Sequence, residues 1–433
     1  MSRFVKDSLQ TLALSGINRI LGIAVGILLA RSLGPAGKGT IAYTAIALEL
    51  FIVVMGGVTQ AVTYQLARNG IAGGTVYAAM LRIVAGIAFP AAAVITAVAL
   101  LVPSQHDLLW VAVALPFATY GEATIGLLLG AQQVGATNVQ RVLTGSAFNL
   151  AAIVAVAVFH AGVAPVLALW VLGYIAAAAY AAVAVHPYVR DGGSDAGVLR
   201  DQVRFASKSG LAGVAGYINM RIDVVVVSIV LGPVALGVYT LAIGLAEMLW
   251  QLSQPMCWAA FGRIAIAPAG EAAAFTAKLT RHIIALLLPV AIVVFICAPF
   301  IVTFVYGPAF AEAGPALRWL LPGIVAYAIE IPLGYYIMVK MGRPLLIVGI
   351  QSVSILACVA ITLLTVRRWG IEGAAVATSA TYVTVVVTKA IVFMRATGIG
   401  LVELLFVNAG DIAHNPLLKK LPGFSALVLL MIS

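Results

Sequence analysis

Charged side chains are scarce in this sequence. Asp, Glu, Lys and Arg make up 9% of its 433 residues, whereas about 25% is usual in soluble globular proteins. Apolar residues account for 63% of the chain, and the mean hydropathy is +1.11. So few charges cannot cover the surface of a water-soluble domain. The composition therefore excludes a soluble protein and predicts a chain that is embedded in a membrane.

Cysteine and catalytic motifs are lacking as well. Cys257, Cys297 and Cys358 each lie in an apolar run without paired spacing, which argues against a disulfide framework and a zinc site. The five histidines are scattered, and no G-x-S-x-G, H-E-x-x-H or P-loop pattern occurs. We therefore expect no catalytic residue, no metal, no cofactor beyond a possible coupling H⁺ or Na⁺, and no enzyme activity.

Long apolar runs, separated by Gly, Pro and charged residues, predict about twelve transmembrane helices, because about 20 apolar residues cross a bilayer. The expected helices are residues 9–33, 41–67, 77–102, 108–130, 142–159, 163–185, 205–231, 234–260, 279–306, 314–339, 345–366 and 371–394. Arg3 and Lys6 before an apolar stretch resemble a signal peptide, but Asn18 and Arg19 interrupt that stretch. We therefore expect a retained first helix.

The basic residues predict the orientation of these helices. With the N-terminus in the cytoplasm, inner loops and helix ends hold 17 Lys or Arg and the outer side holds five, namely Arg31, Lys38, Arg318, Arg367 and Arg368. Basic residues concentrate on the cytoplasmic side of membrane proteins, so the net charge of +10 indicates topology and not nucleic-acid binding. We expect a multi-pass protein of the bacterial cytoplasmic membrane with both termini inside. Lys389, near an inner helix end, is expected to snorkel out.

Sequence repetition divides the chain into halves. Leu33-Gly34-Pro35, Gly39 and Glu49 recur 198 residues later as Leu231-Gly232-Pro233, Gly237 and Glu247. Gly135, Gly162 and Tyr174 recur, at a spacing constant within one residue, as Gly342, Gly370 and Tyr382. Six helices per half make the repeats parallel, and such transporters bind substrate between the halves. The fold predicted is all-α, with six-helix lobes at 1–187 and 205–396, a cytoplasmic linker at 188–204 and a cytoplasmic or interfacial tail at 397–433.

Polar residues near the centres of the predicted spans are the candidate site, because unpaired charge at that depth is costly. Arg19 and Arg221 lie on one helical face, one turn apart in depth when measured from the Leu-Gly-Pro turns. We expect both to bind a pyrophosphate, which guanidinium groups hold bidentately. Asn18 and Asn219 accompany them. The alternative is that the arginines form structural ion pairs with Glu49, Asp223 or Glu247.

Acidic residues occur at the same depth. Glu49 and Glu247 are repeat partners, and Glu122 and Glu330 lie near the middles of the fourth and tenth predicted helices. Together with Asp223 they are expected to balance charge. Asp223 and Glu247 can also bind a coupling cation, since a buried carboxylate exchanges protons readily. The alternative for each is a static hydrogen-bonded pair.

The first outer turn carries a resemblance to a known family. Residues 29–39, LARSLGPAGKG, are similar to the A-R-x-L-G-P-x-x-x-G signature of polysaccharide biosynthesis transporters, the Wzx-like O-antigen and exopolysaccharide flippases. Ser15-Gly16, Asn18-Arg19 and a turn centred on Gly135 resemble that family as well. The resemblance implies the fold of the multidrug/oligosaccharidyl-lipid/polysaccharide (MOP) exporter superfamily, with alternating access around a cationic cavity. It also implies an undecaprenyl-pyrophosphate-linked glycan as substrate and, often, cation antiport.

The leading hypothesis is therefore a flippase that carries a polyprenyl-pyrophosphate-linked oligosaccharide to the outer leaflet, works as a monomer and contacts membrane lipid. Lipid II flippases of the superfamily usually have fourteen helices, and the twelve predicted here argue against that branch. The alternatives are a drug/cation antiporter of the same fold and, from another class, a membrane glycan polymerase or ligase. The polymerase or ligase would need a sizeable extramembrane loop, and every predicted outer loop is short.

Overall fold

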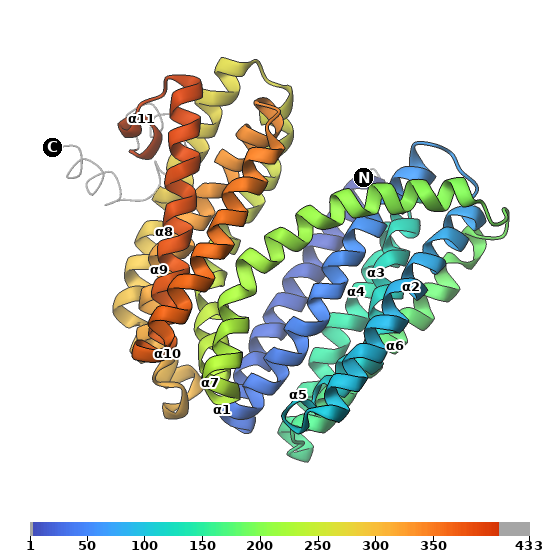
Figure 1. Cartoon of the computed structure of the whole chain (residues 1–433), viewed down its shortest axis with the longest axis horizontal. Coiled ribbons are helices and arrows are strands. Elements are labelled where there is room, and N and C mark those ends of the chain that lie inside the picture. The colour runs from blue at the N-terminus through green and yellow to red at the C-terminus, as the bar shows by residue number, and fades with distance from the viewer. Residues whose placement is uncertain (1–2, 407–433) are drawn as a thin grey trace. The chain divides into compact units, whose positions relative to one another are not determined.

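The computed structural model describes residues 3–406, and every regular element in that range is helical (Figure 1). The long helices are α1 (Arg3–Ala67), α2 (Gly73–Leu101), α3 (Leu108–Gly130), α4 (Val134–Val142), α5 (Phe148–Phe159), α6 (Val163–Val185), α7 (Ala196–Ile266), α8 (Ala269–Tyr306), α9 (Ala313–Tyr335) and α10 (Pro344–Thr397). Within the described range, nine helical stretches are long and apolar enough to cross a membrane. Three of these, α1, α7 and α10, each contain a non-helical glycine, which is compatible with the twelve crossings predicted.

The repeated Leu-Gly-Pro sequence forms the same turn twice. Gly34 in α1 has φ 67° and ψ −176°, and Gly232 in α7 has φ 78° and ψ −173°. Glycine adopts positive φ without the clash that a Cβ would cause. The proline that follows has the φ of a helical first turn and needs no amide hydrogen there. Each turn therefore ends one helical segment and begins the next.

The two turns also pack against each other, backbone to backbone. A Cβ built on Gly39 would lie 1.8 Å from the Pro233 carbonyl oxygen, and one built on Gly237 would lie 1.9 Å from the Pro35 carbonyl oxygen. Small residues permit such close helix contacts in membranes. The contact is reciprocal, because Pro35 and Gly39 are the repeat partners of Pro233 and Gly237. It lies within one compact unit of the chain.

The chain forms two compact units. The first contains residues up to Arg221, with Leu231–Val238 and Val305–Ala309. Its apolar cores gather around Met55, Met80 and Leu127, and around Leu48 and Leu115.

The second unit contains Ile222–Val230, Tyr239–Phe304 and the described residues from Phe310 onward. Its core includes Ile283 and Phe393. The lobe boundaries proposed from the sequence stay a prediction, and the chain crosses between the units within α7.

Two expected positions differ in the structure. The helix expected to begin at residue 205 begins earlier, because α7 begins at Ala196. Asp195 caps this helix, because its Oδ1 accepts the backbone N–H groups of Gly197 at 2.7 Å and Val198 at 3.3 Å. The turn expected at Gly135 centres on Gln132, which has φ 59°, and Gly135 lies inside α4.

Of the tail predicted at 397–433, the described part contains α11 (Leu401–Leu405). The part from residue 407 lies outside the described residues.

Candidate functional site

In the first unit, Tyr217 brings together a candidate arginine and a candidate acid. The Tyr217 hydroxyl lies 2.9 Å from the Ile46 carbonyl oxygen and 3.1 Å from Glu49 Oε2. A hydrogen bond also joins this hydroxyl to Arg221, and the charges of Glu49 and Arg221 both act on it. Tyr217 and Arg221 are four residues apart in α7, so they share a helical face. The guanidinium of Arg221 and the carboxylate of Glu49 therefore meet at one hydroxyl group.

In the second unit, Asp223 is the centre of a buried hydrogen-bond network. Its side chain is 2% exposed. The hydroxyls of Tyr239 and Thr378 each donate to Asp223 Oδ2 at 2.6 Å, and the Val224 N–H donates to Oδ1 at 2.8 Å. Asn219 is also buried, one turn earlier on the same face of α7. Three hydrogen-bond donors therefore converge on this one buried carboxylate.

Aromatic rings extend from this network toward the second acid of the unit. The charges of Asp223 and Glu247 both act on the hydroxyl group of Tyr382. Its ring packs on Tyr327 at a centroid distance of 5.1 Å, and Tyr327 contacts Trp250 edge-on at 5.4 Å. Asp223 and Glu247 therefore border a common aromatic cluster. Among the described residues, no three His, Cys, Asp or Glu side chains gather closely enough to hold a metal ion.

Asn18 and Arg19 have different environments in α1. Asn18 Oδ1 lies 3.4 Å from the Ser146 hydroxyl and 3.3 Å from Asn149 Nδ2, and a Cβ on Gly145 would lie 2.5 Å from that oxygen. Gly145 belongs to a π-helical segment, Leu143–Ala147, between α4 and α5. Asn18 is therefore engaged in helix packing. The neighbouring Arg19 is exposed, so its guanidinium is accessible to a ligand.

Glu122 lies in α3 at a tightly packed contact with α1. The Thr59 hydroxyl donates to the Glu122 carbonyl oxygen at 2.8 Å, and the Thr63 hydroxyl donates to Gly126 O at 3.0 Å. Arg141 is close enough for its charge to act on the Glu122 carboxylate. Glu122 therefore belongs to the first unit, as does Glu49, whereas Asp223 belongs to the second unit.

Lys389 does not snorkel, and that prediction is wrong. Its side chain is 1% exposed and forms an ion pair with Glu330 of α9. The two groups lie beside Gly334, where a Cβ would be in van der Waals contact with both, at 3.5 Å from Lys389 Nζ and 3.8 Å from Glu330 Oε1. A lysine next to a carboxylate inside the protein gains a partner that it would lack at the membrane surface. The pair therefore holds Lys389 inward and neutralises Glu330.

We expect this ion pair to be a large stabilising element that fails when one partner is removed. Lys389→Met should lower the free energy of unfolding by about 3–5 kcal/mol, because it leaves a buried uncompensated charge. Lys389→Met/Glu330→Leu should recover most of that loss, since it removes both charges. Unfolding by sodium dodecyl sulfate in mixed micelles measures both values. A double variant as unstable as the sum of its single variants would contradict the pairing.

Sequence reasoning missed three groups that orient the candidate residues, namely Tyr217, Tyr239 and Thr378, and it gave Lys389 the wrong role. A contact between Tyr217 and Arg221 could have been predicted from the sequence, because Tyr217 precedes Arg221 by one helical turn. The contacts of the hydroxyl groups with Asp223 could not have been predicted, since Tyr239 and Thr378 lie far from Asp223 in sequence. Arg31 of the first outer turn also has a structural contact: its Nε donates to the Val305 carbonyl oxygen at 2.7 Å.

The apolar helical stretches of the described residues define a class of protein, the multi-pass helical membrane proteins. Solved structures with a similar fold include the following three. The lipid II flippase MurJ, in an inward closed conformation, has a TM-score of 0.71 and 13% identity, over 98% of this chain and 95% of that one. An inward-facing multidrug resistance MATE family transporter of the MOP superfamily has a TM-score of 0.70 and 14% identity, over 90% and 98%. A MOP superfamily transporter from Pyrococcus furiosus has a TM-score of 0.61 and 13% identity, over 91% and 95%.

These likenesses confirm the predicted fold class. The chain belongs to the family described as "Polysaccharide biosynthesis protein", whose sequence model matches residues 28–315. This match confirms the resemblance seen in the first outer turn. A comparison with curated proteins finds no match. The chain is thus a polysaccharide biosynthesis protein by family, and its fold is similar to that of the MOP transporter and the flippase above.

Proposed function

We propose that this transporter flips an undecaprenyl-pyrophosphate-linked oligosaccharide from the inner to the outer leaflet of the bacterial cytoplasmic membrane. It works by alternating access as a monomer, with both termini in the cytoplasm. The family description supports a role in polysaccharide biosynthesis, and one of the similar structures is a lipid II flippase. The protein moves its substrate and performs no covalent step on it.

The observation that carries this proposal is the arrangement of Arg221, Glu49 and Tyr217. Tyr217 links the guanidinium to the carboxylate. A pyrophosphate competes for the guanidinium because it offers more charge and a bidentate match. Arg221 then binds the phosphates, and Glu49 is released. The accessible Arg19 supplies the second guanidinium.

Asp223 and Glu247 are the proposed coupling groups. Asp223 is a buried carboxylate that is surrounded by hydroxyl groups, and hydroxyl and carboxylate oxygens are the ligands that hard cations prefer. H⁺ or Na⁺ binding there neutralises the carboxylate and loosens its hold on Tyr239 and Thr378. Asn219 contributes a further polar group on the same face. Glu122 and Glu330 balance the charges of Arg141 and Lys389.

Substitution of the two arginines tests the proposal. Arg19→Ala and Arg221→Ala should each slow flipping about 10-fold or more, because a charge-assisted hydrogen bond to phosphate is worth about 1.5–3 kcal/mol. Arg221→Lys should recover only part of the rate, since lysine cannot bind bidentately. The assay is translocation of a lipid-linked oligosaccharide in proteoliposomes. Arg204→Ala is the matched control, because Arg204 is an exposed arginine of the same helix. Wild-type rates in both alanine variants would refute the phosphate role.

A drug/cation antiporter is the second candidate, because the chain is about as similar to a MATE transporter as to the flippase. The acidic and aromatic cluster of Asp223, Glu247, Tyr382 and Tyr327 also suits an organic cation. The two functions give opposite results in one experiment. If wild-type protein lowers the ethidium sensitivity of a host that lacks other exporters, and the arginine variants retain this activity, the antiporter is favoured. If it restores surface glycan and leaves ethidium sensitivity unchanged, the flippase is favoured.

A further inference from the structure

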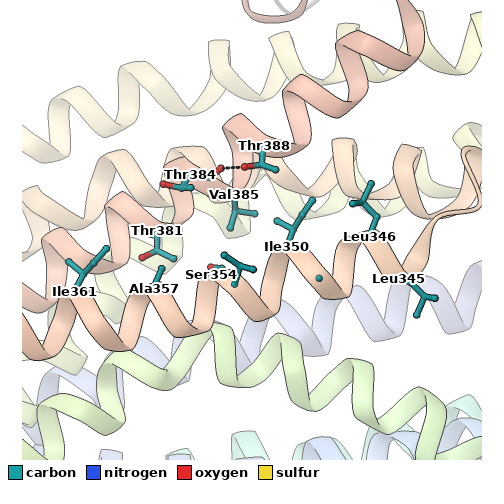
Figure 2. Close-up of a pocket in the computed structure, with 12 residues that line it drawn as sticks. Leu345, Leu346, Ile350, Ser354, Ala357, Ile361, Thr381, Thr384, Val385 and Thr388 are labelled. Carbon is teal, nitrogen blue, oxygen red and sulfur yellow. Dashed lines mark hydrogen bonds between the residues drawn. The ribbon is translucent and has the colours of Figure 1, made fainter.

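A cavity of about 440 Å³ lies in the second unit, between the two segments of α10 that meet at Gly370 (Figure 2). One wall comes from the first segment, between Leu345 and Ile361, and the other from the second segment, between Thr381 and Thr388. No charged residue lines it. We call this cavity the α10 groove.

The α10 groove is apolar even though threonines form much of one wall. The hydroxyls of Thr381, Thr384 and Thr388 donate to the carbonyl oxygens one turn earlier in the same helix, at 2.6, 2.8 and 2.8 Å. These hydroxyls therefore have partners already and need none from a ligand. The opposite wall consists of Leu, Ile, Val, Ala and Gly, with Ser354 the sole hydroxyl residue. Such a surface suits a hydrocarbon and offers a sugar little to bind.

The shape and exposure of the groove indicate a long chain that enters from the bilayer. Both segments belong to a membrane-span candidate. Groove residues Leu345 and Val353 are 83% and 69% exposed, so the groove is open at the surface of the second unit. From Leu345 to Ile361 the helix rises about 24 Å, at 1.5 Å per residue, which is most of the thickness of a bilayer's hydrocarbon core.

Basic residues follow both ends of the groove. Leu345 lies near one end (Figure 2), and the exposed Arg343 lies two residues before it in the chain. Ile361 lies near the other end, and the exposed Arg367 and Arg368 follow it. An anionic head group can therefore find positive charge at either membrane face while its chain stays in the groove. This arrangement complements a lipid whose phosphate moves from one face to the other.

We propose that the α10 groove holds the isoprenoid chain of the lipid-linked glycan during translocation. The proposal rests on the proposed function, because that function supplies an isoprenoid lipid as substrate. The chain packs against the apolar wall and the threonine methyl groups. The pyrophosphate is carried separately by the arginines. Chain binding adds affinity for the substrate and selects it from lipids with the same head-group charge.

Filling the groove tests the proposal. A Cβ on Gly349 would meet no atom within 4 Å, so Gly349→Leu can fold and occupy the groove. It should weaken binding of radiolabelled undecaprenyl phosphate about 10-fold, which corresponds to lost contact with about two methylene groups. Val353→Phe, at an exposed groove position, should do the same. Gly86→Leu in α2 is the matched control, because Gly86 is also exposed and a Cβ there would meet no atom within 4 Å. This variant should bind undecaprenyl phosphate like the wild-type protein.

Binding is measured on the purified full-length protein in detergent micelles, with farnesyl phosphate and phosphatidylglycerol as competitors. Weak competition by both supports a groove that binds a long isoprenoid chain. Wild-type affinity in Gly349→Leu and Val353→Phe would overturn the proposal. Equal competition by phosphatidylglycerol would overturn it too, since the groove would then hold ordinary phospholipid.

The proposed function and the proposal for the α10 groove can be refuted independently of each other. A wild-type protein that flips lipid-linked oligosaccharide, while both groove variants bind the probe normally, overturns the groove alone. A wild-type protein that binds the probe through the groove but flips no lipid-linked oligosaccharide overturns the proposed function alone.

Discussion

The Asp223→Asn variant should fold and insert like the wild-type protein, but its rate of cation-dependent transport should fall about 100-fold. Asparagine has the shape of aspartate and keeps an oxygen that can accept from Tyr239 or Thr378, whose hydroxyls donate to the native carboxylate at 2.6 Å. It removes the negative charge, however, and about 3 kcal/mol of cation interaction corresponds to about 100-fold. The measurement is substrate flipping in proteoliposomes as H⁺ and Na⁺ gradients are imposed in turn.

Two further variants separate the charge of Asp223 from its structural role. Thr378→Val removes one donor but leaves the carboxylate, so transport should fall only a few-fold. Asp223→Ala leaves Tyr239 and Thr378 without their buried acceptor and should also destabilise the protein. If Asp223→Asn transports at the wild-type rate with unchanged ion dependence, Asp223 is a structural residue and the coupling site lies elsewhere.

Gly39→Ala and Gly237→Ala should each destabilise the protein by about 3 kcal/mol or more, or prevent its accumulation in the membrane. The added methyl group would lie within 2 Å of a proline carbonyl oxygen on the opposing turn. That oxygen belongs to rigid backbone and cannot rotate away as a side chain does, so the two turns must separate. Unfolding in mixed micelles and the yield of folded protein measure the effect.

A matched control isolates the steric cause. Gly244 is in α7, seven residues after Gly237, and a Cβ there would meet no atom within 4 Å. Gly244→Ala should therefore be neutral or slightly stabilising, because alanine favours helix over glycine. The reciprocal contact also predicts non-additivity: once one substitution has separated the turns, the second should cost less. Additive losses in Gly39→Ala/Gly237→Ala would contradict a shared contact.

The sequence predicted the helical architecture well, because membrane-spanning helices are runs of mostly apolar residues that can be recognised from composition. Each apolar run became a helix, and the repeated Leu-Gly-Pro sequence became the same turn at Gly34 and Gly232. These features depend on neighbouring residues alone. The resemblance in the first outer turn was equally local, and the family match confirms it.

The sequence predicted the pairing of polar groups poorly, because pairing depends on how distant helices pack. Lys389 lies near a helix end, where lysines often reach the membrane surface, but α9 and α10 bring it to Glu330. In the same way, Tyr239 and Thr378 come from separate helical segments to reach Asp223. Because charged residues are rare in the apolar runs, the sequence identified the acidic and basic members of each group. It could not identify the hydroxyl groups, since Tyr and Thr are ordinary residues in apolar helices.

The reciprocal contact of the two Leu-Gly-Pro turns has the symmetry of a dimer interface. Pro35 meets Gly237, and Pro233 meets Gly39, so each half presents the same patch to the other. Contacts of this isologous form are what identical subunits make across a two-fold axis in a homodimer. Inside one chain, the two turns therefore reproduce the contact that two copies of one such half would make as a homodimer.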